Sequence, residues 1–345
     1  MRNIILTMLA TFVVAGCGGS SGDSGSANAT PGSGSGGEAP VSVGVSKPPT
    51  EVPEVPDDGD QLQACVAIQS VKLTNLAGEI VEWTTRSMNG EVKSSEQCIP
   101  EGSEIPVYDD GTPKFIVIDL HDITGVDLVD LISEQLVPVG EYVSMALSLA
   151  RGEYEFLDDL PVNVPIDEFM GVPYSYVGSW VDNKVIDDDL TFDGLNININ
   201  APEKFVMTFD FRSMFKLVEN AYKFKQEAFQ LLNEKLSGSI FGDIDLSSCP
   251  TTDNAYVYLY ESNDEQEKYG DLGSNEYTPT MTAKVTEENN YTMPYVPAGN
   301  YDVVLVCDGL LDLPDQIDLD IDLDGDSPKY TDQQLAGGED KYLPL

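Results

Sequence analysis

Short runs of alternating apolar and polar residues dominate the chain after Gln61. The runs are rich in Val, Ile, Tyr and Thr, and Gly, Pro, Asn and Asp separate them, which is the pattern of β-strands joined by turns. The clearest predicted strands are residues 66–73, 114–120, 142–149, 195–199, 205–211, 255–260 and 301–307. The pattern therefore predicts a mainly β fold.

One segment, residues 213–236, has a helical period instead. Its apolar residues recur at steps of three and four: Leu217, Ala221, Phe224, Ala228 and Leu231. Ser213 can serve as the N-cap, and Gly238 follows the end. We predict one long helix here, about 36 Å in length at 1.5 Å per residue.

A weak internal repeat appears once in each half of the chain. Residues 137–142 read Val-Pro-Val-Gly-Glu-Tyr, and residues 296–301 read Val-Pro-Ala-Gly-Asn-Tyr. Proline fixes the entry to a turn, glycine permits a positive φ, and the tyrosine begins the next strand. The repeat predicts a corner between two antiparallel strands in each half. It therefore favours two antiparallel β-sandwich domains joined by the long helix.

The N-terminus has the order of a secretion signal. Arg2 precedes an apolar run over residues 4–14, and small residues stand directly before Cys17. The run is too short to span about 30 Å of hydrocarbon. A cysteine after small residues matches a lipobox, so we expect cleavage after residue 16 and attachment of palmitate-type acyl chains to Cys17. Gly18 and Gly19 follow Cys17 at the position where an aspartate would signal retention in the inner membrane. Their presence favours an anchor in the outer membrane, with the protein facing the periplasm or the surface.

These features predict five segments. Residues 1–16 are the signal peptide. Residues 17–60 are the lipidated cysteine and a disordered tether, because their Gly, Ser and Pro cannot bury enough apolar surface to fold. Residues 61–212 form the first sandwich, 213–236 the connecting helix, and 237–345 a second sandwich with an acidic tail.

The charge of the chain is strongly negative. It has 18 basic and 60 acidic residues, for a formal net charge of −42. Such a surface repels nucleic acid and anionic lipid, so no nucleic-acid partner is expected, and it favours cations, basic proteins or extracellular polymers. The alternative is that the acids serve solubility in a salty medium, where ions screen them from one another.

Four cysteines remain when the lipidated one is set aside. An exported protein meets an oxidising compartment, and one pair falls in each predicted domain, which favours Cys65–Cys98 and Cys249–Cys307 over the other two connectivities. A zinc site is not expected, because there is no CxxC motif and the only histidine is His121.

Four motifs in the first half resemble a family of bacterial lipoproteins carrying the domain of unknown function 4382. They are Val71-Lys72-Leu73, Ile118-Asp119-Leu120, residues 137–142 and Phe209-Asp210-Phe211-Arg212. The second half, with residues 255–260 and the corner at Pro297-Ala298-Gly299, resembles a carboxypeptidase-regulatory, prealbumin-like sandwich. Such sandwiches usually act as spacers or binding modules. The resemblance implies architecture and location, and no catalytic residues.

Calcium is the metal that the sequence best permits. Asp320, Asp322 and Asp324, followed by Gly325, resemble the opening of a calcium-binding loop, although Thr331 stands where the loop needs glutamate. The alternative is a strand with its acids facing outward, where like charges discourage edge-to-edge pairing. No other cofactor is expected.

The catalytic motifs that a sequence can reveal do not occur. The predicted folded part, residues 61–345, has no Gly-x-Ser-x-Gly elbow, Walker loop or dinucleotide fingerprint. Catalysis by histidine would have to use His121, for which a solvated loop residue is the alternative reading. We therefore expect a non-enzymatic, lipid-anchored binding or structural module. A calcium-dependent adhesion or matrix module is the alternative, and a hydrolase is the third.

Overall fold

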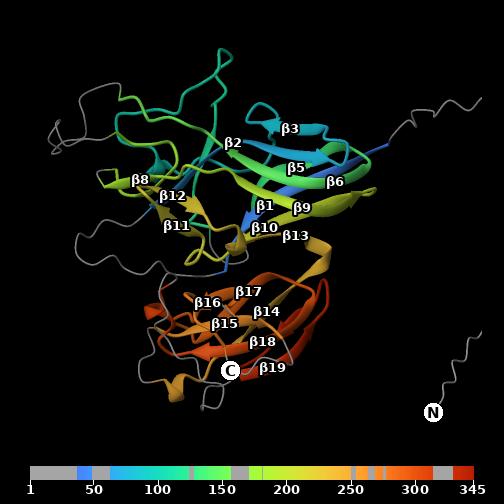
Figure 1. Ribbon diagram of the computed structural model, residues 1–345, viewed down its shortest axis with the longest axis vertical. Coiled ribbons are helices and arrows are strands. Elements are labelled where there is room, and N and C mark those ends of the chain that lie inside the picture. The colour runs from blue at the N-terminus through green and yellow to red at the C-terminus, as the bar shows by residue number, and fades with distance from the viewer. Residues whose placement is uncertain are drawn as a thin grey trace, which may run out of the picture. The chain divides into compact units, whose positions relative to one another are not determined.

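The computed structural model describes residues 37–48, 63–123, 128–156, 171–180, 182–249, 254–262, 269–274, 277–313 and 329–345, and β-strands dominate these residues (Figure 1). Each of the strands predicted from sequence overlaps an observed one, so the mainly β fold is confirmed. In the described part of the chain, no helix is long and apolar enough to cross a membrane.

The first sandwich consists of two sheets and a hairpin. One sheet has the order β13 (Phe229–Asn233), β10 (Glu203–Phe209), β1 (Glu38–Ser46) and β5 (Val129–Pro138). The other has the order β8 (Asn183–Val185), β7 (Tyr176–Gly178), β2 (Gln63–Asn75), β6 (Gly140–Leu149) and β9 (Leu190–Ile199), with β3 (Ile80–Thr84) and β4 (Ile116–Asp119) also paired to β2. The hairpin consists of β11 (Phe215–Val218) and β12 (Ala221–Phe224).

The second sandwich also has two sheets. One has the order β17 (Asn290–Pro297), β14 (Ser237–Asp243) and β20 (Asp340–Tyr342), and the other has the order β16 (Met281–Lys284), β15 (Tyr256–Glu261), β18 (Gly299–Val306) and β19 (Lys329–Leu335). Short 3-10 helices connect the strands: η1 (Glu96–Cys98), η2 (Gln226–Ala228), η3 (Glu234–Leu236), η4 (Leu246–Ser248) and η5 (Gly309–Leu311).

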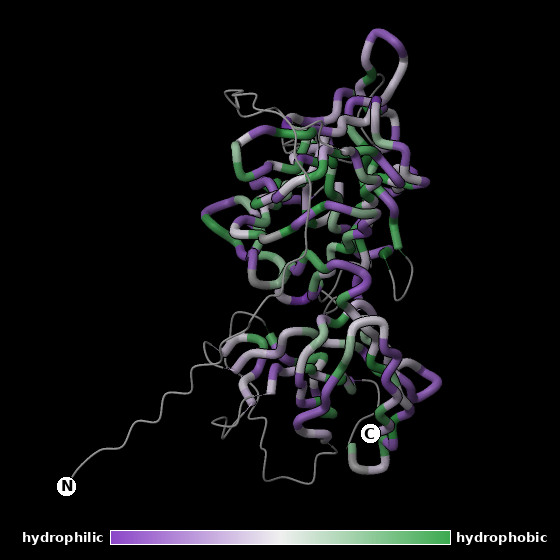
Figure 2. Tube along the Cα trace, turned by 90° about the vertical axis from the view of Figure 1, so that its right-hand side faces the viewer, coloured by the Kyte–Doolittle hydropathy of each residue, from purple (hydrophilic) through white to green (hydrophobic). Residues whose placement is uncertain are grey.

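A central strand in each sandwich is buried on both faces. Alternate residues of β2, such as Val66 and Ile68, enter the core between the two sheets, while Cys65 and Ala67 join a smaller apolar cluster on the outer face. Since both faces are covered, the strand reads as a continuous apolar run rather than as a strict alternation. Figure 2 shows hydrophobic stretches of the chain, in green, interspersed with hydrophilic ones, in purple.

The equivalent strand in the second sandwich, β15, uses tyrosine for its outer face. Val257 and Leu259 belong to the core between the sheets, whereas Tyr256, Tyr258 and Tyr260 form a separate buried cluster. Each of these tyrosines is at most 1% exposed. A buried phenol needs a hydrogen-bond partner. The outer face of β15 is therefore an apolar layer that also requires polar neighbours.

Both predicted disulfides are present. Cys65 bonds to Cys98 across 33 residues, and Cys249 bonds to Cys307 across 58 residues. Each closes a loop within one sandwich, which removes conformational freedom from the unfolded chain.

The prediction of a disordered tether over residues 17–60 is wrong for residues 38–46. These nine residues form β1, which pairs in parallel with β10 and antiparallel with β5. The Gly- and Ser-rich composition hides a short period-two pattern, in which Val41, Val43 and Val45 are at most 3% exposed. β1 is thus the strand that joins β10 and β5 into one sheet.

The predicted long helix over residues 213–236 is also wrong. The segment forms β11, β12 and β13 with two short 3-10 turns. Its aromatic residues favour strands, and cross-strand pairing decides the outcome: Phe215 stacks on Phe224 across the hairpin, and β13 pairs with β10. Glu219, with a φ of 57°, lies in the hairpin turn, where a helix could not continue.

The repeated Val-Pro-x-Gly-x-Tyr motif forms a corner in both sandwiches, but the corner joins two sheets. β5 and β6 belong to different sheets, as do β17 and β18. Tyr142 donates its hydroxyl hydrogen to the carbonyl of Pro138 at 2.8 Å, and Tyr301 does the same to Pro297 at 2.9 Å. Neither motif glycine is among the described residues with positive φ. The tyrosine hydroxyl, rather than a left-handed glycine, fixes this change of sheet.

We expect Tyr142→Phe and Tyr301→Phe each to lower the free energy of unfolding by about 0.5–1.5 kcal/mol, because each removes one hydrogen bond and keeps the ring. Urea denaturation measured by far-UV circular dichroism tests this expectation. Tyr277→Phe, at an exposed position, is the control and should change stability by less than about 0.5 kcal/mol. Corner variants as stable as the control would contradict the role of the hydroxyls.

Candidate functional site: the seam between the two sandwiches

Part of the predicted site falls outside the described residues. Cys17 lies there, and so do Asp320, Asp322 and Asp324. Within the described residues, one group has the composition of a metal site, namely Cys65, Cys98 and Asp119. Its two cysteines are bonded to each other, so they offer no thiolate to a metal.

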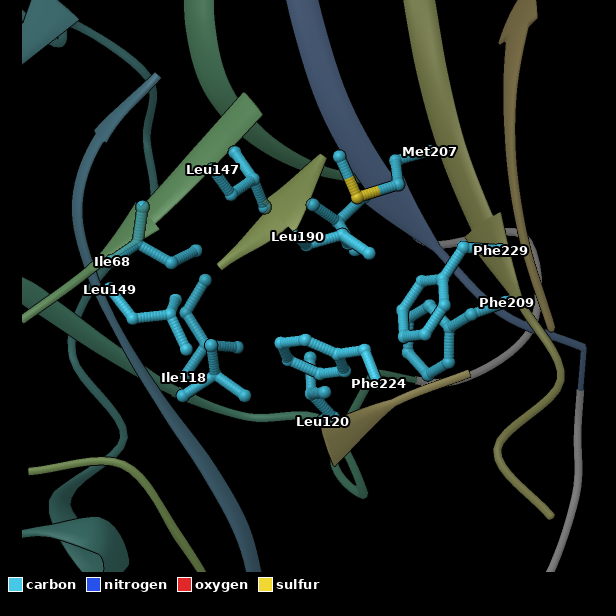
Figure 3. A pocket seen from close by; sticks show the side chains of 12 residues that line it. Ile68, Ile118, Leu120, Leu147, Leu149, Leu190, Met207, Phe209, Phe224 and Phe229 are labelled. Atoms are coloured by element: carbon cyan, nitrogen blue, oxygen red, sulfur yellow. The ribbon is translucent and has the colours of Figure 1, made fainter. Parts of the chain in front are cut away.

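The interior of the first sandwich holds an apolar cavity (Figure 3). Ile118, Leu147, Leu149 and Phe224 are among the side chains that surround it. Its volume is about 20 Å³. Such a space holds one water-sized body at most, and an apolar lining offers water no hydrogen bond. This cavity is therefore a packing feature of the core and is too small for a ligand.

The candidate site lies where the two sandwiches meet, directly after β10; both sandwiches belong to one compact unit, Gly37–Leu345. Arg212 is 6% exposed and reaches the second sandwich. Its Nη1 donates to the hydroxyl of Tyr258 at 3.3 Å, and its Nη2 donates to the backbone carbonyl of Asp312 at 2.5 Å. The guanidinium carbon lies 4.6 Å from the centroid of the Tyr256 ring, within the range of a cation–π contact. Arg212 thus provides the tyrosine layer of β15 with a polar neighbour.

Asp312 completes the network on the side of the second sandwich. It is fully buried, and its Oδ2 accepts hydrogen bonds from the Tyr258 hydroxyl at 2.6 Å and from the backbone N–H of Leu272 at 3.1 Å. Burial raises the pKa of Asp312, and these hydrogen bonds and the charge of Arg212 oppose that rise. Tyr258, Leu272 and Arg212 therefore all stabilise the ionised form of the Asp312 carboxylate.

Asp210 makes a second link across the seam. It is 5% exposed, and its Oδ1 accepts a hydrogen bond from the backbone N–H of Arg212 at 3.0 Å. Its Oδ2 accepts one from the hydroxyl of Thr282, on β16, at 2.8 Å. Burial raises the pKa of Asp210, and the positive charge of Arg212 opposes this effect. Arg212 and Asp210, a basic and an acidic residue of the same segment, therefore both bind the second sandwich.

A cleft of about 510 Å³ opens beside this network. Residues of both sandwiches line it: Asp210, Ser213, Lys216, Lys225 and Ala228 from the first, and Leu272, Gly273, Ser274, Thr278, Pro279 and Thr280 from the second. Small-molecule sites usually have volumes of about 300–1,000 Å³ and lie where domains meet. The cleft is therefore the candidate binding site.

One lysine of the first sandwich is buried. Lys47, directly after β1, is fully buried, and among the described residues its Nζ has no hydrogen-bond partner. The Nζ is 5.2 Å from the centroid of the Phe211 ring. Burial lowers the pKa of Lys47 to about 8, and the charges of Asp119 and Asp210 oppose that shift.

His121 has a structural position in the same region. Its backbone N–H donates to Oδ1 of the buried Asp119 at 2.9 Å, and its ring lies 5.8 Å from that of Phe211. The Oδ1 of Asp119 also accepts the backbone N–H of Ala64 at 3.1 Å. These contacts fix the loop after β4.

None of the described site residues predicted from the sequence lines the cleft. The sequence does contain one signal that could have located the cleft, namely a short basic segment within a strongly acidic chain. Residues 212–225 contain four basic residues and one acidic residue, in a chain with 18 basic and 60 acidic residues. Such an asymmetry within one segment is typical of an interaction surface.

No protein-family model and no curated protein sequence matches the chain. Among solved structures, the Bacillus anthracis TIE protein is similar at 11% identity and a TM-score of 0.20, covering 89% of this chain and 34% of that one. A candidate cell adhesion protein from Bacteroides fragilis is similar at 7% identity and a TM-score of 0.18, covering 89% of this chain and 92% of that one. The fimbrial anchor protein Mfa2 from Porphyromonas gingivalis is similar at 9% identity and a TM-score of 0.16, with 78% and 79% covered. This chain spans about a third of the TIE protein. TM-scores this low establish neither a shared fold nor a shared function.

We expect Arg212→Met to lower the free energy of unfolding by about 1–3 kcal/mol, because the Tyr258 hydroxyl and the backbone carbonyl of Asp312 lose a buried donor, and Asp210 and Asp312 lose a charge that opposes the rise of their pKa values. Urea denaturation at neutral pH measures the change. Arg86→Met is the matched control, since Arg86 is exposed in its ion pair with Asp110 and should contribute less than about 1 kcal/mol. Equal losses in the two variants would contradict the role of Arg212 in the seam.

We expect the free energy of unfolding to gain up to about 3 kcal/mol from Lys47 as the pH rises from 8 to 10.5. Over this range the folded lysine loses its proton while the unfolded lysine, with its ordinary pKa of 10.5, keeps it. The unfolded state then binds more protons, so stability increases with pH. Denaturation curves at several pH values should show this gain in the wild type and lack it in Lys47→Met. Parallel pH profiles for the two proteins would rule it out.

Proposed function

We propose that this chain is a lipid-anchored lipoprotein of the bacterial envelope or cell surface, acting as a non-enzymatic binding module. The signal-like N-terminus that ends at Cys17 supports the anchor. The observation that carries the binding role is the cleft at the seam, whose walls come from both sandwiches. The anchor is proposed to lie in the outer membrane, with the folded part facing the periplasm or the surface.

The construction of the cleft suits a binding role. Apart from Lys216 on β11 and Ala228 in η2, its lining residues lie in turns and loops of the two disulfide-bonded sandwiches. The contacts of Arg212 and Asp210 beside the cleft hold the two walls together. A ligand that touches both walls therefore meets groups that these contacts already bring together, which lowers the entropic cost of binding.

We expect Cys17→Ser to abolish incorporation of radiolabelled palmitate and to move the protein from the detergent phase to the aqueous phase, because the variant has no thiol to acylate. Phase partitioning of whole-cell extracts measures this shift. Ser21→Ala, a nearby change in the same segment, should leave the partitioning unchanged. Loss of anchoring in both variants, or in neither, would contradict a lipid attached at Cys17.

Binding without catalysis needs its own assay. The intact lipidated protein is incubated with a panel of envelope and extracellular polysaccharides and peptides, and both retention and chemical change of each polymer are measured. The proposal expects at least one polymer to be retained intact. Release of hydrolysis products without retention would replace the binding module with a hydrolase.

A further inference from the structure

Exposed aliphatic side chains gather at one end of the first sandwich. Leu76, in the turn between β2 and β3, is 69% exposed, Ile80 at the start of β3 is 60% exposed, and Val139, at the corner between β5 and β6, is 40% exposed. The N–H of Leu76 donates to the carbonyl of Glu141 at 3.0 Å, so the turn and the corner are neighbours. A single exposed leucine is ordinary, whereas a group from separate segments marks an interaction surface. We call Leu76, Ala77, Ile80 and Val139 the apolar tip.

The turn that carries most of the apolar tip is fixed by its own hydrogen bonds. The Oδ1 of Asn75 accepts the backbone N–H groups of Ala77 at 3.0 Å and Glu79 at 2.8 Å, and its Nδ2 donates to the Glu79 carboxylate at 2.8 Å. Gly78, with a φ of 83°, supplies the left-handed residue that the turn requires. The exposed side chains are therefore presented on an ordered turn, which lowers the entropic cost of binding a partner.

The chain enters the first sandwich at the same end. Gly37 is the first residue that the structure describes, and its carbonyl accepts the N–H of Val139 at 2.8 Å. Cys17, the proposed site of lipid attachment, is twenty residues earlier in the sequence. Even a fully extended chain of this length spans at most about 70 Å. The apolar tip therefore lies beside the described residue that is joined to the anchor by the fewest residues.

Acidic residues surround the apolar tip and limit the kind of membrane that it fits. Glu38, Glu79 and Glu141 are exposed, and Glu38 pairs with Pro138, next to Val139. Carboxylates are repelled by anionic headgroups. Zwitterionic headgroups carry an ammonium group that can approach the carboxylates while the aliphatic side chains enter between the lipids.

We infer that the apolar tip inserts into the headgroup region of a zwitterionic bilayer, the same bilayer that holds the acyl chains of Cys17. The inference rests on the proposed anchor and adds a second contact with the membrane. Shallow insertion of aliphatic side chains is weak by itself, but the anchor keeps the lipid at a high effective concentration. Two contacts with one surface hold the first sandwich in one orientation.

Depth-dependent quenching in proteoliposomes tests the inference. The full lipidated protein carries a fluorophore on Ala77→Cys, or on Val107→Cys as the control, since Val107 is 54% exposed in the loop before β4. The bilayer is phosphatidylethanolamine and phosphatidylcholine with a spin-labelled lipid as quencher. We expect at least about threefold stronger quenching at position 77 than at 107, because only the tip enters the lipid.

Variants then identify the side chains responsible. Leu76→Ser with Ile80→Ser should reduce quenching at position 77 to the level of the control label. Leu217→Ser with Val218→Ser, two exposed aliphatic residues of β11, should leave it unchanged. Far-UV circular dichroism confirms that both double variants are folded. Quenching that survives the loss of Leu76 and Ile80 would overturn the role of the tip.

The outcomes separate this inference from the proposed anchor. If the protein is retained in the proteoliposomes but positions 77 and 107 are quenched equally, the inference falls and the anchor stands. Failure of the vesicles to retain the protein would remove both. Cross-linking between copies at Ala77→Cys without quenching would assign the tip to a second copy of the chain. Stronger quenching in phosphatidylglycerol vesicles would overturn the preference for a zwitterionic surface.

Discussion

The structure depends on the burial of one guanidinium group at the boundary of the two sandwiches. A charge removed from water is stable only when its neighbours replace the lost hydration. Arg212 belongs to the first sandwich, and the acceptors of its Nη atoms, Tyr258 and the carbonyl of Asp312, belong to the second. The two Nη atoms of Arg212 therefore depend on the second sandwich for their acceptors. In return, Tyr258 and the carbonyl of Asp312 gain a charged donor, while Tyr258, Asp312 and Leu272 also bond one another within the second sandwich.

The proposed function follows from this dependence. The cleft has one wall on each sandwich, so its shape is set by the contacts that hold the sandwiches together. Recognition at the cleft then depends on the local arrangement of its two walls rather than on the chain's net charge of −42, because ions screen distant charges.

The strands and the disulfides could be predicted from the sequence because their signals are local: period-two alternation, and one cysteine pair in each half. β1 and the segment 213–236 could not. In β1 the alternating Ala and Val residues are diluted by the Gly- and Ser-rich sequence around them, and in 213–236 the same aromatic spacing fits a helix or a hairpin until β13 pairs with β10. The cleft joins residues about 60 apart in sequence, such as Ser213 and Ser274, so only the tertiary structure brings it together. The motif at 209–212 was visible, but its partners in the second sandwich were not.

We infer that the two sandwiches form a single cooperative unit through the Arg212 network. Differential scanning calorimetry of the mature protein measures this, because a single unit unfolds in one transition whose calorimetric and van't Hoff enthalpies agree. We expect one such transition. Two separate transitions, with one sandwich melting while the other stays folded, would contradict it.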